Sequence, residues 1–140
     1  MRPYEHRHIV ALEETNVVGN VYFANHIRWQ GRCREMFLRE HSPDVLEGLR
    51  DGLSLVTVRC SCEYFLELFA FDEVLMLMWL KNRTQNRLTM LFEYFRTKEH
   101  DREMVAKGEQ ELVCMRRDGQ GYRPAPFPQS LDRALDLYAG

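Results

Sequence analysis

The sequence predicts an α+β domain in which an antiparallel sheet of about five strands curves around one long helix. Apolar residues follow a helical period over residues 21–40, and four segments of strand character come after that helix. Strands grouped after a single helix favour an antiparallel sheet over a parallel, doubly wound one. With 140 residues, of which 45% are hydrophobic, the chain has the size and apolar content of one domain, residues 1–140.

The helix predicted over residues 21–40 is apolar around a wide arc. One stripe contains Phe23, Ile27, Arg34 and Leu38. The adjacent stripe contains Trp29, Cys33, Met36 and Phe37. Such a helix is expected to be wrapped by other structure. Gly31 in its middle costs about 1 kcal/mol relative to alanine, which indicates the close approach of another backbone. We expect the helix to end at His41, Ser42 and Pro43.

Five segments have the composition and alternation of strands: residues 4–12, 53–65, 74–82, 88–97 and 103–116. A hairpin turn is predicted over residues 83–87, and the turn at residues 118–119 ends the last strand. The prolines at positions 124, 126 and 128 indicate an extended, irregular segment. Ser130 is then expected to cap a short helix over residues 131–138.

The composition disfavours two classes of function. The chain has 19 basic and 21 acidic residues, a net charge of −2 and a pI of about 6.2, so it does not bind nucleic acid through bulk positive charge. The longest apolar stretch, residues 74–80, is much shorter than the roughly 20 residues of a membrane span. The N-terminus also lacks the apolar core of a signal peptide. We expect a soluble, cytoplasmic protein that does not contact membranes.

The four cysteines give no strong sign of a metal site. Cys33, Cys60, Cys62 and Cys114 contain no C-x-x-C pair, and no histidine cluster has the spacing of metal ligands. A zinc site is therefore only weakly indicated. We expect four reduced, mostly buried thiols and neither a metal nor a cofactor.

The segment that leads into the helix is well suited to chemistry. Polar, turn-forming residues precede the apolar helix, namely Thr15, Asn16, Gly19 and Asn20. The start of a helix presents unpaired N–H groups and a partial positive charge, which can hold an anion or a developing oxyanion. Capping and turn formation alone would also explain these residues.

Arg34 is a second candidate because it shares a stripe with bulky apolar side chains. A buried guanidinium without partners is costly, so Arg34 should meet a polar site, a ligand or a carboxylate. The alternative is an arginine at the flank of the helix that pairs with Glu35 or Glu40.

The stretch ETNVVGNVYFANHIRWQGRCREMFL, residues 14–38, resembles the helix-start motif of hotdog-fold acyl thioesterases, the 4-hydroxybenzoyl-CoA thioesterase-like branch. Asn16 stands at the position of the catalytic Asp of that branch and cannot act as a general base. The segment TNVVGNVYF, with RWQGRCREMFL after it, closely resembles the corresponding sequence of the thioesterases of enediyne polyketide biosynthesis. The motif covers about a fifth of the chain, while the predicted strand order is compatible with the hotdog fold over nearly all of it.

The resemblance implies a substrate and a set of site residues. The enediyne subgroup acts on a polyunsaturated β-ketoacyl thioester held on the acyl carrier domain of an iterative polyketide synthase. Hydrolysis and loss of carbon dioxide give a conjugated polyene methyl ketone. The catalytic Asn and Arg of the subgroup correspond to Asn16 and Arg34, and the backbone oxyanion donor corresponds to Phe23. The family also implies a homo-oligomer, a dimer or a tetramer, with active sites at the interface.

These residues suit thioester hydrolysis without a carboxylate base. Backbone N–H donors at the helix start stabilise an oxyanion by about 3–4 kcal/mol each. Asn16 can hold a water near the carbonyl, and Arg34 can bind the β-keto oxygen or the nascent carboxylate. His26 and Glu35 are candidate accessory bases, and an imidazole on the helix surface is the alternative interpretation of His26.

Two larger sets of residues could serve the substrate. An apolar tunnel for the polyene could be lined by Phe65, Leu66, Phe69, Met76, Met78, Trp79, Met90 and Phe92, which ordinary sheet packing would also explain. An acidic carrier domain could bind basic side chains, either Arg28, Arg32 and Arg39 or Lys81, Arg83 and Arg87. Solvated surface charge explains both basic groups as well.

Two other functions compete with the carrier-bound substrate. A general acyl-CoA or aroyl-CoA thioesterase is weakened by Asn16, because such enzymes use a carboxylate at that position. A non-catalytic hotdog module that binds acyl chains or scaffolds a synthase is permitted by Asn16. A half-buried Arg34 would be unusual in a pure scaffold.

Overall fold

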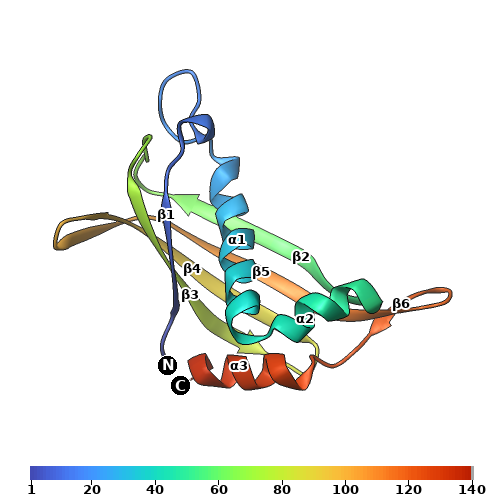
Figure 1. Ribbon diagram of the computed structural model, residues 1–140. Helices are drawn as coiled ribbons and strands as arrows, with labels where there is room; N and C mark the ends of the chain where they lie inside the picture. The colour runs from blue at the N-terminus through green and yellow to red at the C-terminus, as the bar shows by residue number, and fades with distance from the viewer. Residues whose placement is uncertain (140) are drawn as a thin grey trace.

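One long helix, α1 (Ala24–His41), lies against a sheet of antiparallel strands, with a short helix closing one end (Figure 1). The computed structural model describes residues 1–139. The strands follow the order β1-β3-β4-β5-β2, and β6 pairs with β5. The other elements are β1 (Tyr4–Ile9), α2 (Pro43–Gly48), β2 (Leu53–Tyr64), β3 (Glu73–Arg83), β4 (Arg87–Lys98), β5 (Asp101–Asp118), β6 (Gly121–Pro124) and α3 (Gln129–Ala139), with 3-10 turns at Leu12–Glu14 and Leu49–Asp51.

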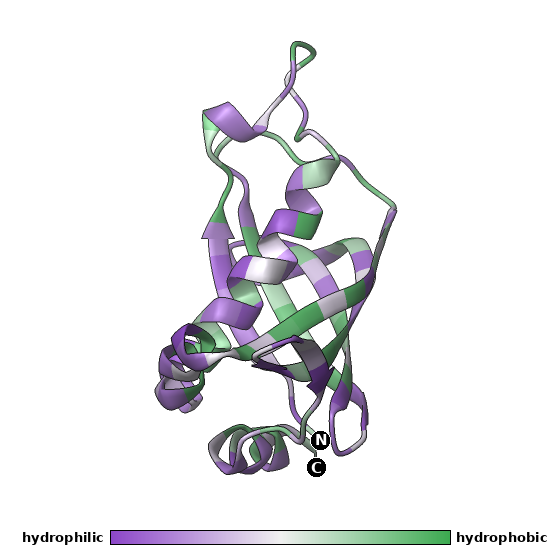
Figure 2. Cartoon of the chain, turned by 90° about the vertical axis from the view of Figure 1, so that its right-hand side faces the viewer, coloured by the Kyte–Doolittle hydropathy of each residue, from purple (hydrophilic) through white to green (hydrophobic). Residues whose placement is uncertain are grey.

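The α+β prediction is confirmed, and the strands curl around α1 (Figure 2). The sheet-facing side of α1 buries Trp29, Cys33 and Phe37. The opposing strands bury apolar side chains that include Met76, Met78, Met90 and Phe92. The predicted tunnel residues of β3 and β4 therefore serve mainly as core, which stabilises the fold by burial of apolar area. None of the helices within residues 1–139 has both the length and the apolar character of a membrane span.

The beginning of the helix differs from the prediction. The helix starts at Ala24 instead of residue 21, because Asn20 and Val21 form isolated bridges with Phe69 and Thr15. The first strand ends at Ile9 instead of residue 12, and a 3-10 turn follows it. The start of the helix is thus fixed by one local bridge, to Thr15, and one distant bridge, to Phe69, neither of which appears in the periodicity of the sequence.

Three features near the ends of elements were missed. Pro43 begins the short helix α2 instead of only ending α1, since proline is tolerated in a first helical turn. The strand β6 extends the hairpin after β5. Ser130 lies inside α3 and is not its cap; its hydroxyl donates to Asp44 at 2.8 Å and contacts the Ser42 hydroxyl at 2.7 Å. These contacts fix α3 against α2.

The outer strand β2 leaves much of its surface open. It forms one edge of the sheet, and the side chains of its middle residues, 56–61, are exposed on both faces. Val56, Val58 and Cys60 belong to this exposed part, so the expectation of mostly buried thiols fails for Cys60. The expected close approach at Gly31 is also wrong for a single chain, because no atom within residues 1–139 lies within 4 Å of a Cβ placed there.

Candidate active site

The loop before α1 holds Asn16 in a tight turn. The side-chain Oδ1 of Asn16 accepts a hydrogen bond from the Val18 amide at 3.0 Å, and its carbonyl accepts from the Gly19 amide at 2.9 Å. Gly19 has a φ of 95°, which favours glycine. These contacts use only the oxygen of the Asn16 side chain. Its Nδ2 group has no hydrogen-bond partner in the described part of the chain and is free to orient a water or a carbonyl.

Glu14 joins this loop to the helix, a role that the sequence did not predict. Its carboxylate accepts hydrogen bonds from the Ala11 amide at 2.8 Å, from the His8 ring at 2.7 Å and from the Trp29 indole at 2.7 Å. Burial alone would raise the pKa of Glu14, but these bonds outweigh burial and lower it. The only sign of this role in the sequence is the presence of an acidic residue two positions before Asn16.

The backbone at the start of α1 offers a donor as expected. The amide of Phe23 has no acceptor among residues 1–139, while its carbonyl accepts a 2.6 Å hydrogen bond from the Tyr64 hydroxyl. Contrary to the prediction of a buried stripe, the Phe23 side chain is 60% exposed. The Phe23 amide is therefore an unpaired donor at the positive end of an 18-residue helix.

His26 is buried, so the alternative of a surface imidazole is wrong. Its side chain is 3% exposed, and neither ring nitrogen has a partner within the described chain. Burial lowers the pKa of His26 to about 4, so the ring is uncharged at neutral pH. His26 lines a cavity of about 240 Å³ together with Phe23, Tyr64 and Phe65. This cavity therefore contains an unpaired polar ring beside the free amide of the helix start.

Arg34 lies farther along α1, and its neutral partners come from the sheet. Its Nη1 donates to Gln110 Oε1 at 2.8 Å and to Thr57 Oγ1 at 3.0 Å. Burial lowers its pKa, opposed by the charge of Glu35. No carboxylate within residues 1–139 forms an ion pair with Arg34, and Glu35 instead lies 3.6 Å from Arg32. Pairing of Arg34 within its own helix, the alternative interpretation, is wrong.

A single chain brings only part of the predicted site together. Phe23 and His26 share one cavity, whereas Arg34 lies ten residues after Ala24, a rise of about 15 Å along the helix. Asn16 and Arg34 make no contact in one chain. Glu35 is exposed and points to Arg32, which leaves His26 as the better placed accessory group.

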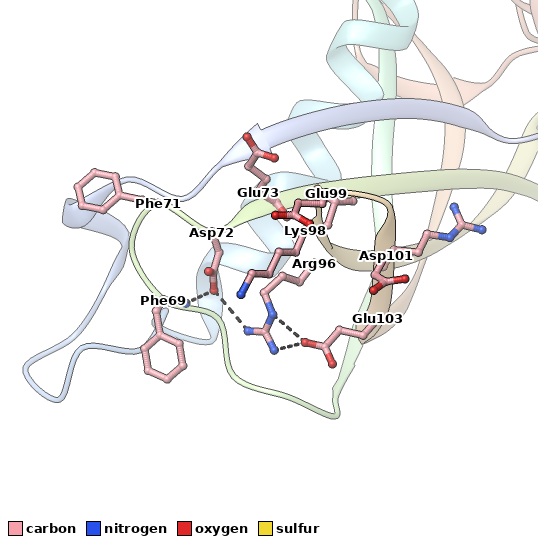
Figure 3. Close-up of a pocket in the computed structure, with 11 residues that line it drawn as sticks. Phe69, Phe71, Asp72, Glu73, Arg96, Lys98, Glu99, Asp101 and Glu103 are labelled. Atoms are coloured by element: carbon pink, nitrogen blue, oxygen red, sulfur yellow. Dashed lines mark hydrogen bonds and ion pairs between the residues drawn. The ribbon is translucent and has the colours of Figure 1, made fainter.

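A larger concavity of about 1040 Å³ lies at the tip of the β4–β5 hairpin (Figure 3). Arg96 is held there between Asp72, at 3.4 Å, and Glu103. Asp72 also accepts a 2.8 Å bond from the amide of Phe69. None of the predicted site residues lines this surface, and its central charge is already paired. The smaller cavity at the helix start is therefore the better candidate for chemistry.

Within residues 1–139, the residues predicted to line a tunnel lie in different places, and the basic residues near the β3–β4 turn are paired with carboxylates. Phe65 and Leu66 line the cavity at the helix start, whereas Met90 lines a separate apolar cleft below Arg34. The basic residues at the β3–β4 turn are paired, as in Lys81 with Glu109 at 2.6 Å and Arg83 with Asp136 at 2.5 Å. Arg87 lies 3.4 Å from a carboxylate of β5. The basic residues of α1 remain exposed, namely Arg28, Arg32 and Arg39.

Comparison with known proteins identifies the chemistry of this arrangement. The sequence pattern of the thioesterase-like superfamily matches residues 10–135, which is most of the chain. The chain belongs to the thioesterase-like superfamily. This thioesterase is similar to the dynemicin thioesterase, whose crystal structures reveal induced fit on polyene binding. The two share 47% sequence identity and a TM-score of 0.93, over 97% of this chain and 96% of that one. No protein of curated function matches the sequence significantly.

More distant structures share the fold of this hotdog thioesterase. A 1,4-dihydroxy-2-naphthoyl-CoA thioesterase from Synechocystis has 18% identity and a TM-score of 0.86, over 96% of each chain. A 4-hydroxybenzoyl-CoA thioesterase from a Pseudomonas strain has 15% identity and a TM-score of 0.79, over 96% of this chain and 99% of that one. The expected hotdog fold and thioester hydrolase activity are confirmed by the superfamily match and the dynemicin thioesterase.

Proposed function

We propose that this thioesterase releases a polyunsaturated β-ketoacyl chain from the acyl carrier domain of an iterative enediyne polyketide synthase. The released β-keto acid then loses carbon dioxide to give a conjugated polyene methyl ketone. The observation that carries this proposal is 47% identity, over nearly the whole chain, to the dynemicin thioesterase and its polyene binding. A cytoplasmic location, together with the synthase, is part of the same proposal.

In the proposed reaction, water attacks the thioester carbonyl at the start of α1. The Phe23 amide donates to the developing oxyanion, and the helix dipole favours its negative charge. Asn16 orients the water through its free Nδ2 group, and uncharged His26 accepts a hydrogen bond from that water. As the carbon–oxygen bond forms, one proton of the water passes to the His26 ring. The carbon–sulfur bond then breaks, the thiolate leaves with the electron pair, and the imidazolium returns that proton to the sulfur, which gives the free β-keto acid and the carrier thiol. No carboxylate base is required, because a β-ketoacyl thioester is electrophilic and a thiolate is a good leaving group.

Arg34 acts on the anionic end of the substrate. Its Nε and Nη2 groups have no partner among the described residues, so they can bind the β-keto oxygen and then the nascent carboxylate. Charge-assisted hydrogen bonds of this type are about twice as strong as neutral ones. The carrier domain docks near the exposed basic residues of α1 in this proposal, since carrier domains present acidic helices.

The working enzyme is proposed to be a homo-oligomer, a dimer or a tetramer. The open edge of β2 and its exposed apolar residues, such as Val56 and Val58, support pairing with a second copy. Asn16 and Arg34 do not meet within one chain, so a second copy is needed to complete a site that uses both. This agrees with the position of β2 beside Arg34, which bonds to Thr57 of that strand.

Co-expression with a polyene-forming iterative synthase tests the function. The expected result is a yellow polyene methyl ketone that is absent when the thioesterase is omitted. An unchanged product profile with an active synthase would contradict the proposal and favour a scaffold. In a parallel assay, turnover of simple acyl-CoA esters faster than turnover of the carrier-bound polyene would instead favour a general acyl-CoA thioesterase.

A further inference from the structure

A buried series of hydrogen-bonded amide groups runs from Ser61 of β2 through Gln30 of α1 and Gln110 of β5 to Arg34. Gln30 Nε2 donates to the Ser61 carbonyl at 2.9 Å, and Gln110 Nε2 lies 3.5 Å from Gln30 Oε1. The remaining oxygen, Gln110 Oε1, accepts from Arg34 Nη1 at 2.8 Å. Gln30 is 0% exposed and Gln110 is 4% exposed. Two polar side chains are thus buried between α1 and β5, at a position that apolar residues could fill.

The Ser61 carbonyl fixes the orientation of both glutamine amide groups. A backbone carbonyl can only accept, so Gln30 must present its Nε2 to Ser61 and its Oε1 to Gln110. Gln110 must then present its Nε2 to Gln30, which aims its Oε1 at Arg34. Gly108 supplies the space, since a Cβ at that position would collide with Gln30 Nε2 and the Ser61 carbonyl.

The partners of Arg34 hold its side chain without neutralising it. Both contacts, Gln110 Oε1 and Thr57 Oγ1, are uncharged acceptors, and both bind Nη1. A carboxylate at either position would form an ion pair and cancel much of the charge that an anionic ligand needs. We propose that the buried Gln30–Gln110 amide pair positions Arg34 and preserves its positive charge for the carboxylate formed on hydrolysis. This inference rests on the proposed role of Arg34.

Substitution of glutamine by glutamate tests the inference with little change in shape. The purified enzyme is titrated with decanoate, which carries a carboxylate, and with decan-2-one, an uncharged ketone of the same length. Gln110→Glu should weaken decanoate binding at least about tenfold while changing decan-2-one binding less than about twofold. Gln120→Glu, which adds the same charge in an exposed turn, should leave both affinities unchanged.

Three further variants keep the test decisive if Gln110→Glu does not fold. Thr57→Asp places a carboxylate at the other contact, on the exposed strand β2, and should cause the same selective loss of decanoate binding. Thr57→Val is its uncharged control and should bind decanoate within about threefold of the wild type, because Gln110 still holds Arg34. Gln110→Met should lower kcat with little change in KM, since it disorders Arg34 without removing the acyl-binding surface.

The results separate this inference from the proposed function. Folded Gln110→Glu and Thr57→Asp enzymes that bind decanoate like the wild type would overturn the inference, even if Arg34→Met is inactive. An equal loss of decanoate and decan-2-one binding would also overturn it, because it would indicate general disruption of the site. An Arg34→Met enzyme with wild-type turnover would instead remove Arg34 from the proposed function.

Discussion

The carboxylate of Glu14 accepts a hydrogen bond from the indole nitrogen of Trp29 at 2.7 Å, so the loop that holds Asn16 is fixed to the side of α1. The second oxygen of Glu14 binds the Ala11 amide and His8. The Glu14 carbonyl also accepts from the Asn25 side chain at 2.8 Å. One residue therefore links the first strand, the loop and the start of the helix, and determines where Asn16 lies relative to the cavity.

Glu14→Gln should lower the free energy of unfolding by about 1–3 kcal/mol at pH 7, because one donor then faces an amide N–H group. The folded-state pKa of Glu14 lies below the ordinary value of 4.5, so its stabilisation is complete above pH 4.5 and is lost as the pH falls through the folded value. Urea unfolding at pH 7 and pH 4 should show a smaller difference at pH 4. Glu13→Gln, in an exposed position, is the control. An equal difference at both pH values would contradict this assignment.

His26 should produce a pH dependence in a different range. Its pKa falls from 6.5 to about 4 on folding, so the unfolded chain takes up the proton first. Stability should fall by up to about 3 kcal/mol as the pH drops from 6.5 to 4. His26→Phe should flatten this slope in chemical unfolding curves, whereas His100→Gln, at an exposed turn, should retain it. A His26→Phe slope equal to that of the wild type would show that folding does not lower the pKa of His26.

The main elements were predictable because their patterns are local. Periodicity located α1 and all five long strands to within a few residues. The start of α1 was missed because it depends on bridges from Asn20 and Val21 to other segments. The six-residue helix at Pro43 is not predictable in this way, because it is too short to show a period and because a proline after a helix also indicates the end of that helix.

For the candidate site, the sequence predicted which residue types need polar partners, but not which residues those partners are. The cost of burying a guanidinium correctly indicated that Arg34 needs polar partners. Its actual partners, Thr57 and Gln110, are 23 and 76 residues away, so sheet register and helix packing decide them. The role of Glu14 depends in the same way on Trp29, which lies 15 residues later on one face of α1. Long-range geometry of this kind has no signature in a single sequence.

Gly31 provides a test of what lies beside the helix. Apart from the backbone of α1 itself, no atom of residues 1–139 lies within 4 Å of a Cβ placed at this position, so Gly31→Ala should stabilise an isolated subunit by about 0.5–1 kcal/mol through helix propensity. Urea unfolding of the wild type and the variant measures this gain. Gly119→Ala, which also adds a methyl group in open space but outside a helix, is the control. Lower stability, or a weaker oligomer by ultracentrifugation, would show that a second copy packs on Gly31.

Arg34→Met should lower turnover of the thioester at least about 100-fold while the protein stays folded. The methionine side chain fills the space beside Leu55 and Met90, whereas the Nε and Nη2 donors are lost. Stopped assays of acid release measure turnover, and thermal unfolding checks the fold. Arg28→Met removes an exposed arginine of the same helix and should retain hydrolysis of a small acyl thioester. Arg34→Met leaves the acceptor oxygens of Gln110 and Thr57 without a donor, so we expect some loss of stability. Wild-type turnover in this variant would exclude the guanidinium from the mechanism.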